Sequence, residues 1–172
     1  MQLFHVSETA GIEVFQPRRS SLFPELGPLV WSIDAAHLAN YLLPRDCPRV
    51  TFTASSATTR EDRTRFSVDD VLRVVVIEQN WFGRVLSATV HVYELPSDGF
   101  RLHDQSAGYW IAKSAVRPLG VCAVSELPTA MGRYGASLRV EDNLWPLHDA
   151  VIVSTLDYSM IRMRHAACRI VP

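Results

Sequence analysis

The sequence predicts an α+β domain with a mixed, mostly antiparallel sheet. Short runs in which apolar and polar residues alternate, such as "ATVHVYELP" at residues 88–96, are typical of strands with one buried face. Runs with helical spacing lie between them, and most strand-like runs fall in the second half. No loop of the form G-x-G-x-x-G or G-x-x-x-x-G-K follows any of these strands. The pattern therefore favours α+β packing over a doubly wound nucleotide-binding sheet.

Length and composition indicate one soluble globular domain over residues 1–172. The hydrophobic fraction is 48% and the charged fraction is 20%, and 172 residues are enough for one core. A formal net charge of -1 gives no overall field toward nucleic acid or a membrane. No apolar stretch approaches the roughly 20 residues of a membrane span, and no signal peptide opens the chain. A cytoplasmic location is the expectation.

The strands are predicted where apolar residues alternate or form short β-branched runs between turn residues. In chain order these runs occupy residues 3–7, 29–34, 49–54, 88–96, 108–114, 119–127, 137–142 and 158–165. Two segments are predicted to be loops. They are residues 10–28, which Gly and Pro punctuate, and the polar, charged residues 56–67.

Two helices are predicted in the first half of the chain. Asp34 is placed to cap a helix over residues 35–43, which Pro44 ends. Asp69 or Asp70 begins a second helix, because apolar residues follow it at helical spacing. These apolar residues are Val76, Ile77, Trp81 and Val85.

Two shorter helices are predicted in the last third of the chain. "PTAMGRYG" at residues 128–135 has a Pro that suits a first turn and a Gly that suits a helix end. "LWPLHDAVIVST" at residues 144–155 predicts a helix that begins near Pro146. Both helices alternate with strands, as the fold class requires.

His5 lies inside the first predicted strand. Because alternate side chains of a strand share a face, His5 and Ser7 point together, away from Phe4 and Val6. One face is apolar, and the other offers an imidazole and a hydroxyl. Two interpretations stay open: a half-exposed strand with incidental polar groups, or a strand that presents His5 and Ser7 to a ligand.

The segment "YLLPRDCPRV" at residues 41–50 has the densest group of polar side chains. Between two prolines and a strand start it holds Tyr41, Arg45, Asp46, Cys47 and Arg49. Asp46 either pairs with a neighbouring arginine and fixes the turn, or the segment builds a site. A nucleophilic Cys47 would need a lowered pKa, which arginines could supply, but no Cys-His-Asn spacing accompanies it.

The basic residues have two interpretations. Of the 17 Lys and Arg residues, all except Lys113 are Arg. Genome composition explains this choice, and so does the planar guanidinium that binds phosphate or carboxylate. In the last predicted strand Arg162 and Arg164 share a face, where they either bind an anion or cover an open sheet.

The cysteine and histidine patterns predict no metal site. Cys47, Cys122 and Cys168 are odd in number and widely spaced, which fits neither a disulfide framework nor a zinc site. No H-x-x-x-H or H-E-x-x-H is present. Cys122, in "GVCAV", is expected to be a small core residue.

Several stretches together resemble known families. "LFHVSE", the loop at residues 12–18, "VWSID" with "HLANYLL", and "SAGYWIAKSAVRPLGVCAVSEL" resemble parts of the ADP-ribosyltransferase superfamily. The whole chain also resembles a family of uncharacterised bacterial proteins that share "LFHVS", "NYLLPRDCPRV", "LWPL" and "SMIRMR". The superfamily resemblance implies a split sheet with flanking helices and an NAD-binding cleft.

The resemblance also implies roles for individual residues. A first-strand histidine, here His5, would bond the adenosine ribose, and an aromatic ring, Tyr41 or Trp31, would stack on the nicotinamide. The catalytic glutamate of the superfamily falls at Gly108, which puts glutamate-dependent transfer in doubt. The RNA 2'-phosphotransferase branch instead uses a histidine and arginines. His5 and a set of arginines resemble that chemistry in residue type: Arg18, Arg45, Arg49 and Arg162.

We therefore predict binding of, or transfer from, an NAD-like or phosphorylated nucleotide in a cleft lined by His5. His5 and Ser7 would bond a ribose hydroxyl or phosphate, and Arg45 and Arg49 would neutralise phosphate with Asp46 orienting one of them. NAD is one candidate substrate, and nucleic acid is expected only as a substrate for modification.

Two rival functions stay open. The first is a non-catalytic protein-interaction module, either monomeric or homodimeric, that uses Trp81, Trp110 and Trp145 as exposed anchors. The second is a small hydrolase that uses Cys47.

Overall fold

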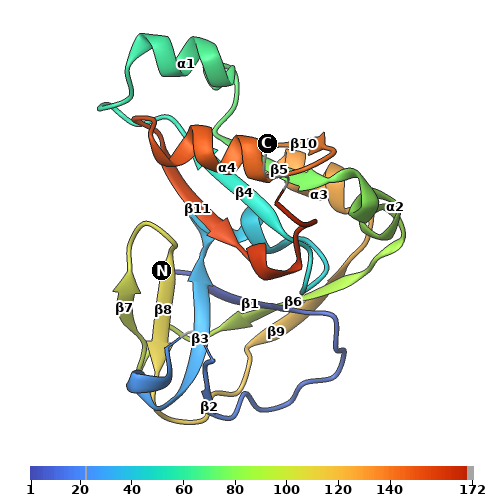
Figure 1. Ribbon diagram of the computed structural model, residues 1–172. Coiled ribbons are helices and arrows are strands. Elements are labelled where there is room, and N and C mark those ends of the chain that lie inside the picture. The colour runs from blue at the N-terminus through green and yellow to red at the C-terminus, as the bar shows by residue number, and fades with distance from the viewer. Residues whose placement is uncertain (22, 170–172) are drawn as a thin grey trace. The chain divides into compact units, whose positions relative to one another are not determined.

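The computed structural model describes residues 1–21 and 23–169 and has an α+β fold. The described chain divides into two compact units, each built from two segments. Unit 1 consists of Met1–Tyr41 and Thr89–Val124, and unit 2 consists of Leu42–Ala88 and the described residues from Ser125 onward. Each unit has its own sheet, and we describe each by itself (Figure 1).

Unit 1 is built on an antiparallel sheet whose strands follow the order β7-β8-β3-β1-β6-β9. The strands are β1 (Leu3–Ser7), β3 (Pro28–Asp34), β6 (Val90–Leu95), β7 (Arg101–Asp104), β8 (Tyr109–Ala112) and β9 (Gly120–Val124). The short β2 (Arg18–Arg19) pairs with the start of β3. Two 3-10 helices, η1 (Pro24–Leu26) and η2 (Ala35–Tyr41), flank β3 in the chain.

One face of the unit 1 sheet carries its hydrophobic core. This core face holds buried Leu3, Phe15, Val30, Tyr93, Leu95, Ala112 and Val116. The Tyr93 hydroxyl lies under the N-terminal loop, where it donates to Thr9 O at 2.9 Å and accepts from Ile12 N at 3.1 Å. The loop is therefore held to the sheet through the buried end of one side chain.

Unit 2 is built on a four-stranded sheet of order β10-β5-β4-β11. Its strands are β4 (Arg49–Thr53), β5 (Arg73–Glu78), β10 (Ala136–Glu141) and β11 (Asp157–Ile161). β10 runs parallel to β5, and the other pairs are antiparallel. The helices are α1 (Arg60–Phe66), α2 (Gln79–Ser87), α3 (Leu127–Arg133), α4 (Trp145–Ile152) and the 3-10 helix η3 (Met163–His165).

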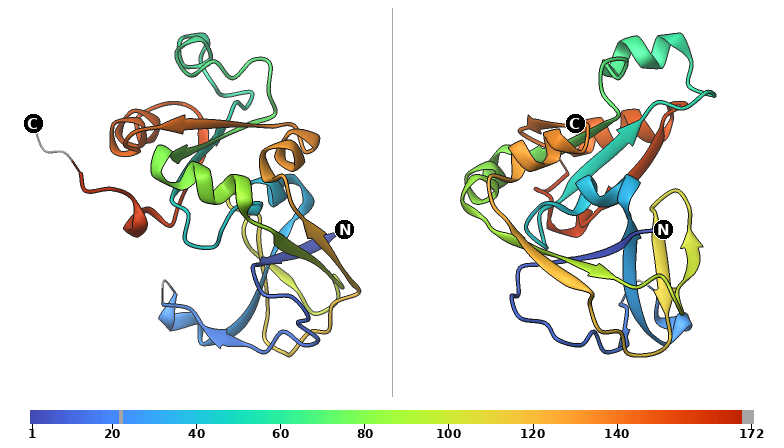
Figure 2. Two further views of the ribbon diagram at one scale, coloured as in Figure 1. Left: turned by 90° about the vertical axis from the view of Figure 1, so that its right-hand side faces the viewer. Right: turned by 180° about the vertical axis from the view of Figure 1, so that it is seen from behind.

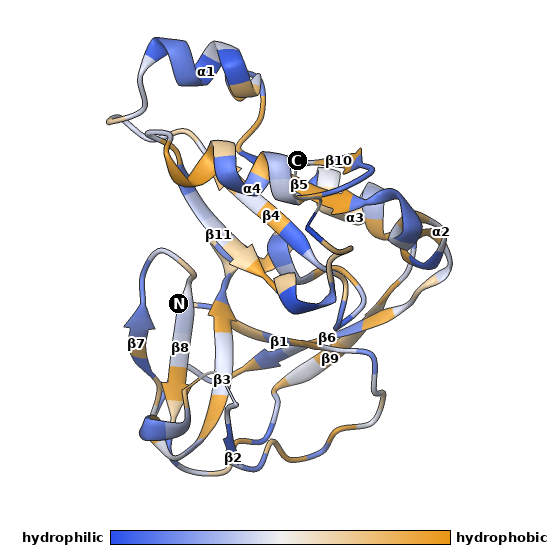
Figure 3. Ribbon diagram, in the orientation of Figure 1, coloured by the Kyte–Doolittle hydropathy of each residue, from blue (hydrophilic) through white to orange (hydrophobic). Residues whose placement is uncertain are grey.

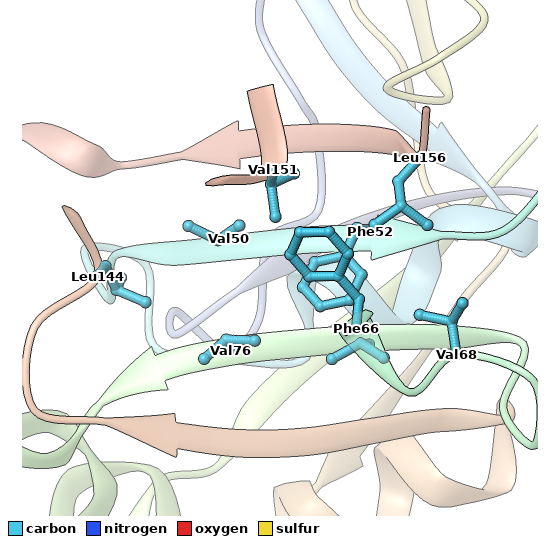
Figure 4. Close-up of a cluster of buried hydrophobic side chains, with 9 residues drawn as sticks. Val50, Phe52, Phe66, Val68, Val76, Leu144, Val151 and Leu156 are labelled. Atoms are coloured by element: carbon cyan, nitrogen blue, oxygen red, sulfur yellow. The ribbon is translucent and has the colours of Figure 1, made fainter. Parts of the chain in front are cut away.

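The core of unit 2 brings together side chains from strands and helices (Figure 4). The rings of Phe52 and Phe66 meet edge to face, with centroids 5.6 Å apart. Val50 and Val76 from the sheet and Val151 from α4 pack beside them. Phe66 thus attaches the end of α1 to the sheet.

Glu78, at the end of β5, is fully buried and ties chain segments together in unit 2. Its carboxylate accepts hydrogen bonds from Leu144 N at 3.3 Å and from Ala167 N at 3.0 Å. The indole Nε1 of Trp145 donates to Ala167 O at 2.8 Å. These bonds hold the start of α4 and the segment near residue 167 to the sheet.

The structure confirms the α+β class and most predicted strands, and it corrects two predicted elements. The helix from Asp69 or Asp70 is wrong, because residues 73–78 form β5, and α2 begins only at Gln79. The apolar run of β5 is buried on both faces, which removes the alternation that reveals a strand. The loop at residues 56–67 is also wrong, because α1 forms there, with Asp62 N donating to the Thr59 side chain at 3.2 Å.

Two finer expectations also differ. The helix after Asp34 has 3-10 geometry and ends at Tyr41, although the Asp34 carboxylate does accept from His37 N as predicted. Cys122 is exposed rather than part of the core, because β9 is an edge strand.

The last predicted strand ends at Ile161. Arg162 has a φ of 58°, and η3 follows, so Arg162 and Arg164 do not share a strand face. Among the residues that the structure describes, no helix is long and apolar enough to cross a membrane.

Candidate functional site

The second face of the unit 1 sheet, opposite its core, carries a cluster of aromatic side chains. Trp31 is paired with Ile111, and Ile33 with Tyr109, so the two aromatic rings share this face. We call it the Trp31 face. The indole of Trp31 contacts three rings: Phe23 at 5.2 Å, His103 at 5.3 Å and Tyr109 at 5.5 Å between centroids.

Tyr109 is the link between the two aromatic residues that the sequence offered as alternatives. Its ring contacts Trp31 and also Tyr41, at 6.0 Å. All three rings are only partly buried. Trp31 Nε1 is nonetheless shielded from solvent and makes no hydrogen bond within the described chain. The Trp31 face therefore combines stacking surface with an unused donor.

Arg18 reaches the same face from β2. It pairs with Leu29, whose side chain points the same way as that of Trp31 two residues later. Arg18 is exposed. A permanently charged guanidinium therefore lies one strand away from the aromatic cluster.

Asp34 and His37 form a close pair at the end of β3. Asp34 Oδ1 lies 2.7 Å from His37 Nδ1, and the side chains are 25% and 14% exposed. A carboxylate only accepts hydrogen bonds, so Nδ1 carries the proton, and the Nε2 of a neutral imidazole is left as an acceptor. The pair thus has the orientation that prepares a histidine to accept a proton.

Gly108 lies directly against this pair. A Cβ built on Gly108 would be 2.3 Å from His37 Nδ1, and its φ of +67° also favours glycine. Gly108 O accepts from Asp34 N at 3.1 Å. The position where the resemblance placed a glutamate therefore has no room for a side chain and has an Asp–His pair beside it.

His5 and Ser7 lie on the core face of the sheet, opposite to the Trp31 indole. His5 Nδ1 donates to the Trp31 carbonyl oxygen at 2.8 Å, and its ring contacts Phe15 at 4.7 Å. Ser7 Oγ accepts from Thr9 N at 3.0 Å. Across the strand pair Ser7 faces His91, whose Nδ1 is buried without a hydrogen bond to any described residue. The structure separates His5 from the ring of Trp31 and places His91 opposite Ser7.

The remaining predicted site residues belong to unit 2. Arg49 is 3% exposed and donates from Nη1 to Cys47 O at 2.7 Å. Its pairing with Ile161 places the turn at Arg162 beside the loop that contains Asp46. Asp46 Oδ1 contacts His165 Nε2 at 3.5 Å. Two segments that the sequence analysis treated separately thus meet at one end of the unit 2 sheet, where Arg45 is exposed.

Cys47 is fully buried in unit 2. Burial raises the pKa of its thiol to about 12, although the nearby Arg49 and Arg84 lower it. The thiol therefore stays protonated at neutral pH, which argues against the hydrolase hypothesis. Within residues 1–21 and 23–169, no group of three or more His, Cys, Asp or Glu side chains could hold a metal ion.

The tryptophans proposed as interaction anchors are partly buried rather than exposed. Trp81 lies under the Arg84 guanidinium at 5.2 Å, and Trp145 under that of Arg169 at 4.6 Å. Trp110 packs against the unit 1 core. Partial burial in each case leaves less indole surface for a partner than the anchor hypothesis assumed.

Sequence reasoning overlooked the Asp34–His37 pair, Tyr109 and His103. The spacing Asp-x-x-His in "DAAH" is a usable signal, because a helical turn after a strand brings the two side chains together. The contacts of Tyr109 and His103 depend on the pairing of β8 with β3 and of β7 with β8, which no local pattern encodes.

The chain belongs to the family of unknown function DUF6886, whose sequence model matches residues 4–166. No curated protein and no solved structure matches the chain. The resemblance to the ADP-ribosyltransferase superfamily thus has no support from a structural neighbour.

Proposed function

We propose that unit 1 binds a phosphorylated nucleotide, with NAD or ADP-ribose as the first candidates, on the Trp31 face. One observation carries the proposal: β3 carries Trp31 of an aromatic cluster, pairs with the strand of Arg18, and ends at an Asp–His pair. A nucleotide needs these three chemistries for its base, its phosphate and its ribose hydroxyls.

The aromatic cluster supplies the surface for the base. The base would stack on the ring of Tyr109, which contacts both Trp31 and Tyr41. Stacking of a base on an aromatic side chain contributes about 1–3 kcal/mol by alanine substitution. The shielded Nε1 of Trp31 gains an acceptor if the ligand reaches it, which offsets the cost of its burial without a partner.

The charged groups supply orientation. Arg18 is positioned to meet phosphate, because its strand partner Leu29 lies on the Trp31 face. The acceptor Nε2 of His37 suits a ribose hydroxyl, which donates. His5 then acts through the backbone: its bond to the Trp31 carbonyl fixes the strand that carries the indole.

A transfer reaction at this site would depend on His37 in place of the missing glutamate. Nε2 of His37 would take the proton of an acceptor hydroxyl as its oxygen bonds to the ribose C1' carbon and nicotinamide leaves. The Asp34 carboxylate, 2.7 Å from Nδ1, stabilises the imidazolium that forms. This transfer requires that the nucleotide binds to the site first.

Thermal shift and titration calorimetry against NAD, ADP-ribose, AMP and a 2'-phosphorylated nucleotide test the proposal. A ligand at a hundred times its dissociation constant stabilises by roughly 2.7 kcal/mol. We expect this shift to vanish in Tyr109→Ala and to weaken in His37→Asn. A matched control is His148→Asn, which removes the histidine of another Asp–His pair, 2.9 Å from Asp149 in unit 2.

A flat panel with folded wild-type protein overturns the proposal. So does a shift that both histidine variants weaken equally. A shift that is lost in Arg49→Lys and kept in Tyr109→Ala would move the ligand to the arginine-rich end of unit 2.

A further inference from the structure

The outer strand of the unit 1 sheet, β9, presents an exposed and uncharged edge. Within the described chain it pairs with β6 alone (Figure 2). Its side chains are exposed over most of its length, and Val121 is 55% exposed. Leu119, just before the strand, is 68% exposed. An edge of this kind offers unpaired backbone groups to another strand.

The opposite edge of the same sheet, β7, has features that protect a strand edge from pairing with another strand. β7 carries Arg101, His103 and Asp104, and its register shifts between Leu102 and Asp104. Charges and irregular pairing are two devices that keep a strand edge from pairing. The strand β9, "GVCAV", has neither charge nor proline, and its ribbon is white to orange where β7 carries blue (Figure 3).

We propose that β9 pairs antiparallel with β9 of a second copy of this chain, about a two-fold axis at Cys122. The sheet would then continue from one protomer into the other. Charge favours a second copy in this orientation. The exposed Arg117 precedes the strand and the exposed Glu126 follows it, so an antiparallel pair brings each arginine near the other copy's glutamate.

The axis at Cys122 gives the proposal a direct readout. Residues that face each other across an antiparallel pair have Cα atoms roughly 4.5–5.5 Å apart. Disulfides form between cysteines whose Cα atoms are about 4.4–6.8 Å apart. The exposed Cys122 thiols of the two copies would thus lie within bonding range. Copper phenanthroline can oxidise them, taking two electrons while two protons are released.

The experiment combines sedimentation velocity with this cross-link. Cys168→Ser serves as the background, because it removes the only other exposed thiol among the described residues. We expect a dimer whose fraction rises with protein concentration and which oxidant converts to a covalent dimer. Cys122→Asp sets two carboxylates against each other and should give a monomer, as should Val121→Lys. Cys122→Ser and the β7-edge variant Leu102→Lys should stay dimeric.

Mixing two charged variants gives the most specific test of the pairing. Cys122→Asp and Cys122→Lys should each be monomeric alone and form a heterodimer together, since opposite charges then meet at the axis. A wild-type monomer at about 1 mM, where even weak specific complexes form, overturns the proposal. A dimer that Cys122→Asp leaves intact, or a mixture that stays monomeric, overturns it as well. Circular dichroism of each variant shows that the fold is kept.

Discussion

The imidazole of His37 fills the space that a side chain at Gly108 would need. A Cβ at Gly108 would lie 2.3 Å from His37 Nδ1, and the backbone there has a φ of +67°. Two separate costs therefore attend any substitution: left-handed backbone strain and a clash with a ring that is itself held by Asp34.

We expect Gly108→Ala to destabilise unit 1 by more than the roughly 1–2 kcal/mol of backbone strain alone. Gly99→Ala is the matched control, because Gly99 has a φ of +81° and nothing within 4 Å of its Cβ position. Urea denaturation of both variants measures the difference. The Cβ of His37 is itself 2.8 Å from that position, so the test background is His37→Gly. In this background the cost of Gly108→Ala should fall to that of Gly99→Ala, and an unchanged cost would show that His37 is not the obstacle.

His5 is expected to matter for stability as well as for any ligand. Its Nδ1 donates to the Trp31 carbonyl at 2.8 Å and its ring packs on Phe15. His5→Ala should lower the free energy of unfolding by about 1–3 kcal/mol, because a part-buried carbonyl loses its donor. His5→Asn keeps a donor near the Nδ1 position and should recover part of the loss. If both variants unfold like wild type in urea, the bond contributes nothing measurable.

Alternation of side chains was enough to predict most strands, and it failed where burial on both faces removed the alternation. Val74, Val75, Val76 and Ile77 are all buried, and the helical spacing of Trp81 and Val85 continues directly after them. The sequence thus reads as one helix across a strand–helix junction at Glu78. Similarly, the polar and charged residues of α1 suggested a loop, although Thr59 is placed to cap a helix there.

The candidate site could be predicted only in part, because pairing register decides which side chains meet. The sequence offered Trp31 and Tyr41 as alternatives, and only the pairing of β3 with β8 brings in Tyr109, whose ring contacts both. The register of β1 against β3, with Leu3 opposite Asp34, sends His5 to the core face. A one-residue slip would have put His5 beside the indole, and no local signal excludes that slip.

Asp62 makes the stability of unit 2 depend on pH. Hydrogen bonds from the Thr155 side chain and backbone, with a smaller one from Thr59, hold the pKa of this carboxyl below its ordinary value of 3.8. A lowered folded-state pKa means that the ionised form stabilises the fold above pH 3.8, and that this stabilisation is lost as the pH falls through the folded pKa. Asp62→Asn should therefore be less stable than wild type at neutral pH, and the gap should close in acid.

Denaturant titrations of wild type and Asp62→Asn at neutral pH and at about pH 3, below the ordinary Asp value, measure this gap. Glu61→Gln is the control, because it removes the neighbouring negative charge of the same helix. A gap that is independent of pH, or equal for both substitutions, would contradict the role of the Thr155 hydrogen bonds.

Cys47 should be inert in the folded protein although arginines surround it. Burial raises the pKa of its thiol to about 12, so almost no thiolate is present at pH 8. Cys122 and Cys168 are exposed. A chromogenic disulfide reagent applied to dilute protein should therefore titrate two thiols quickly and the third only in denaturant. Cys168→Ser should remove one fast thiol, whereas Cys47→Ala should leave both fast thiols and remove the slow one. If Cys47→Ala instead removed one of the fast-reacting thiols, Cys47 would react in the folded state. The hydrolase hypothesis would then have a reactive nucleophile again.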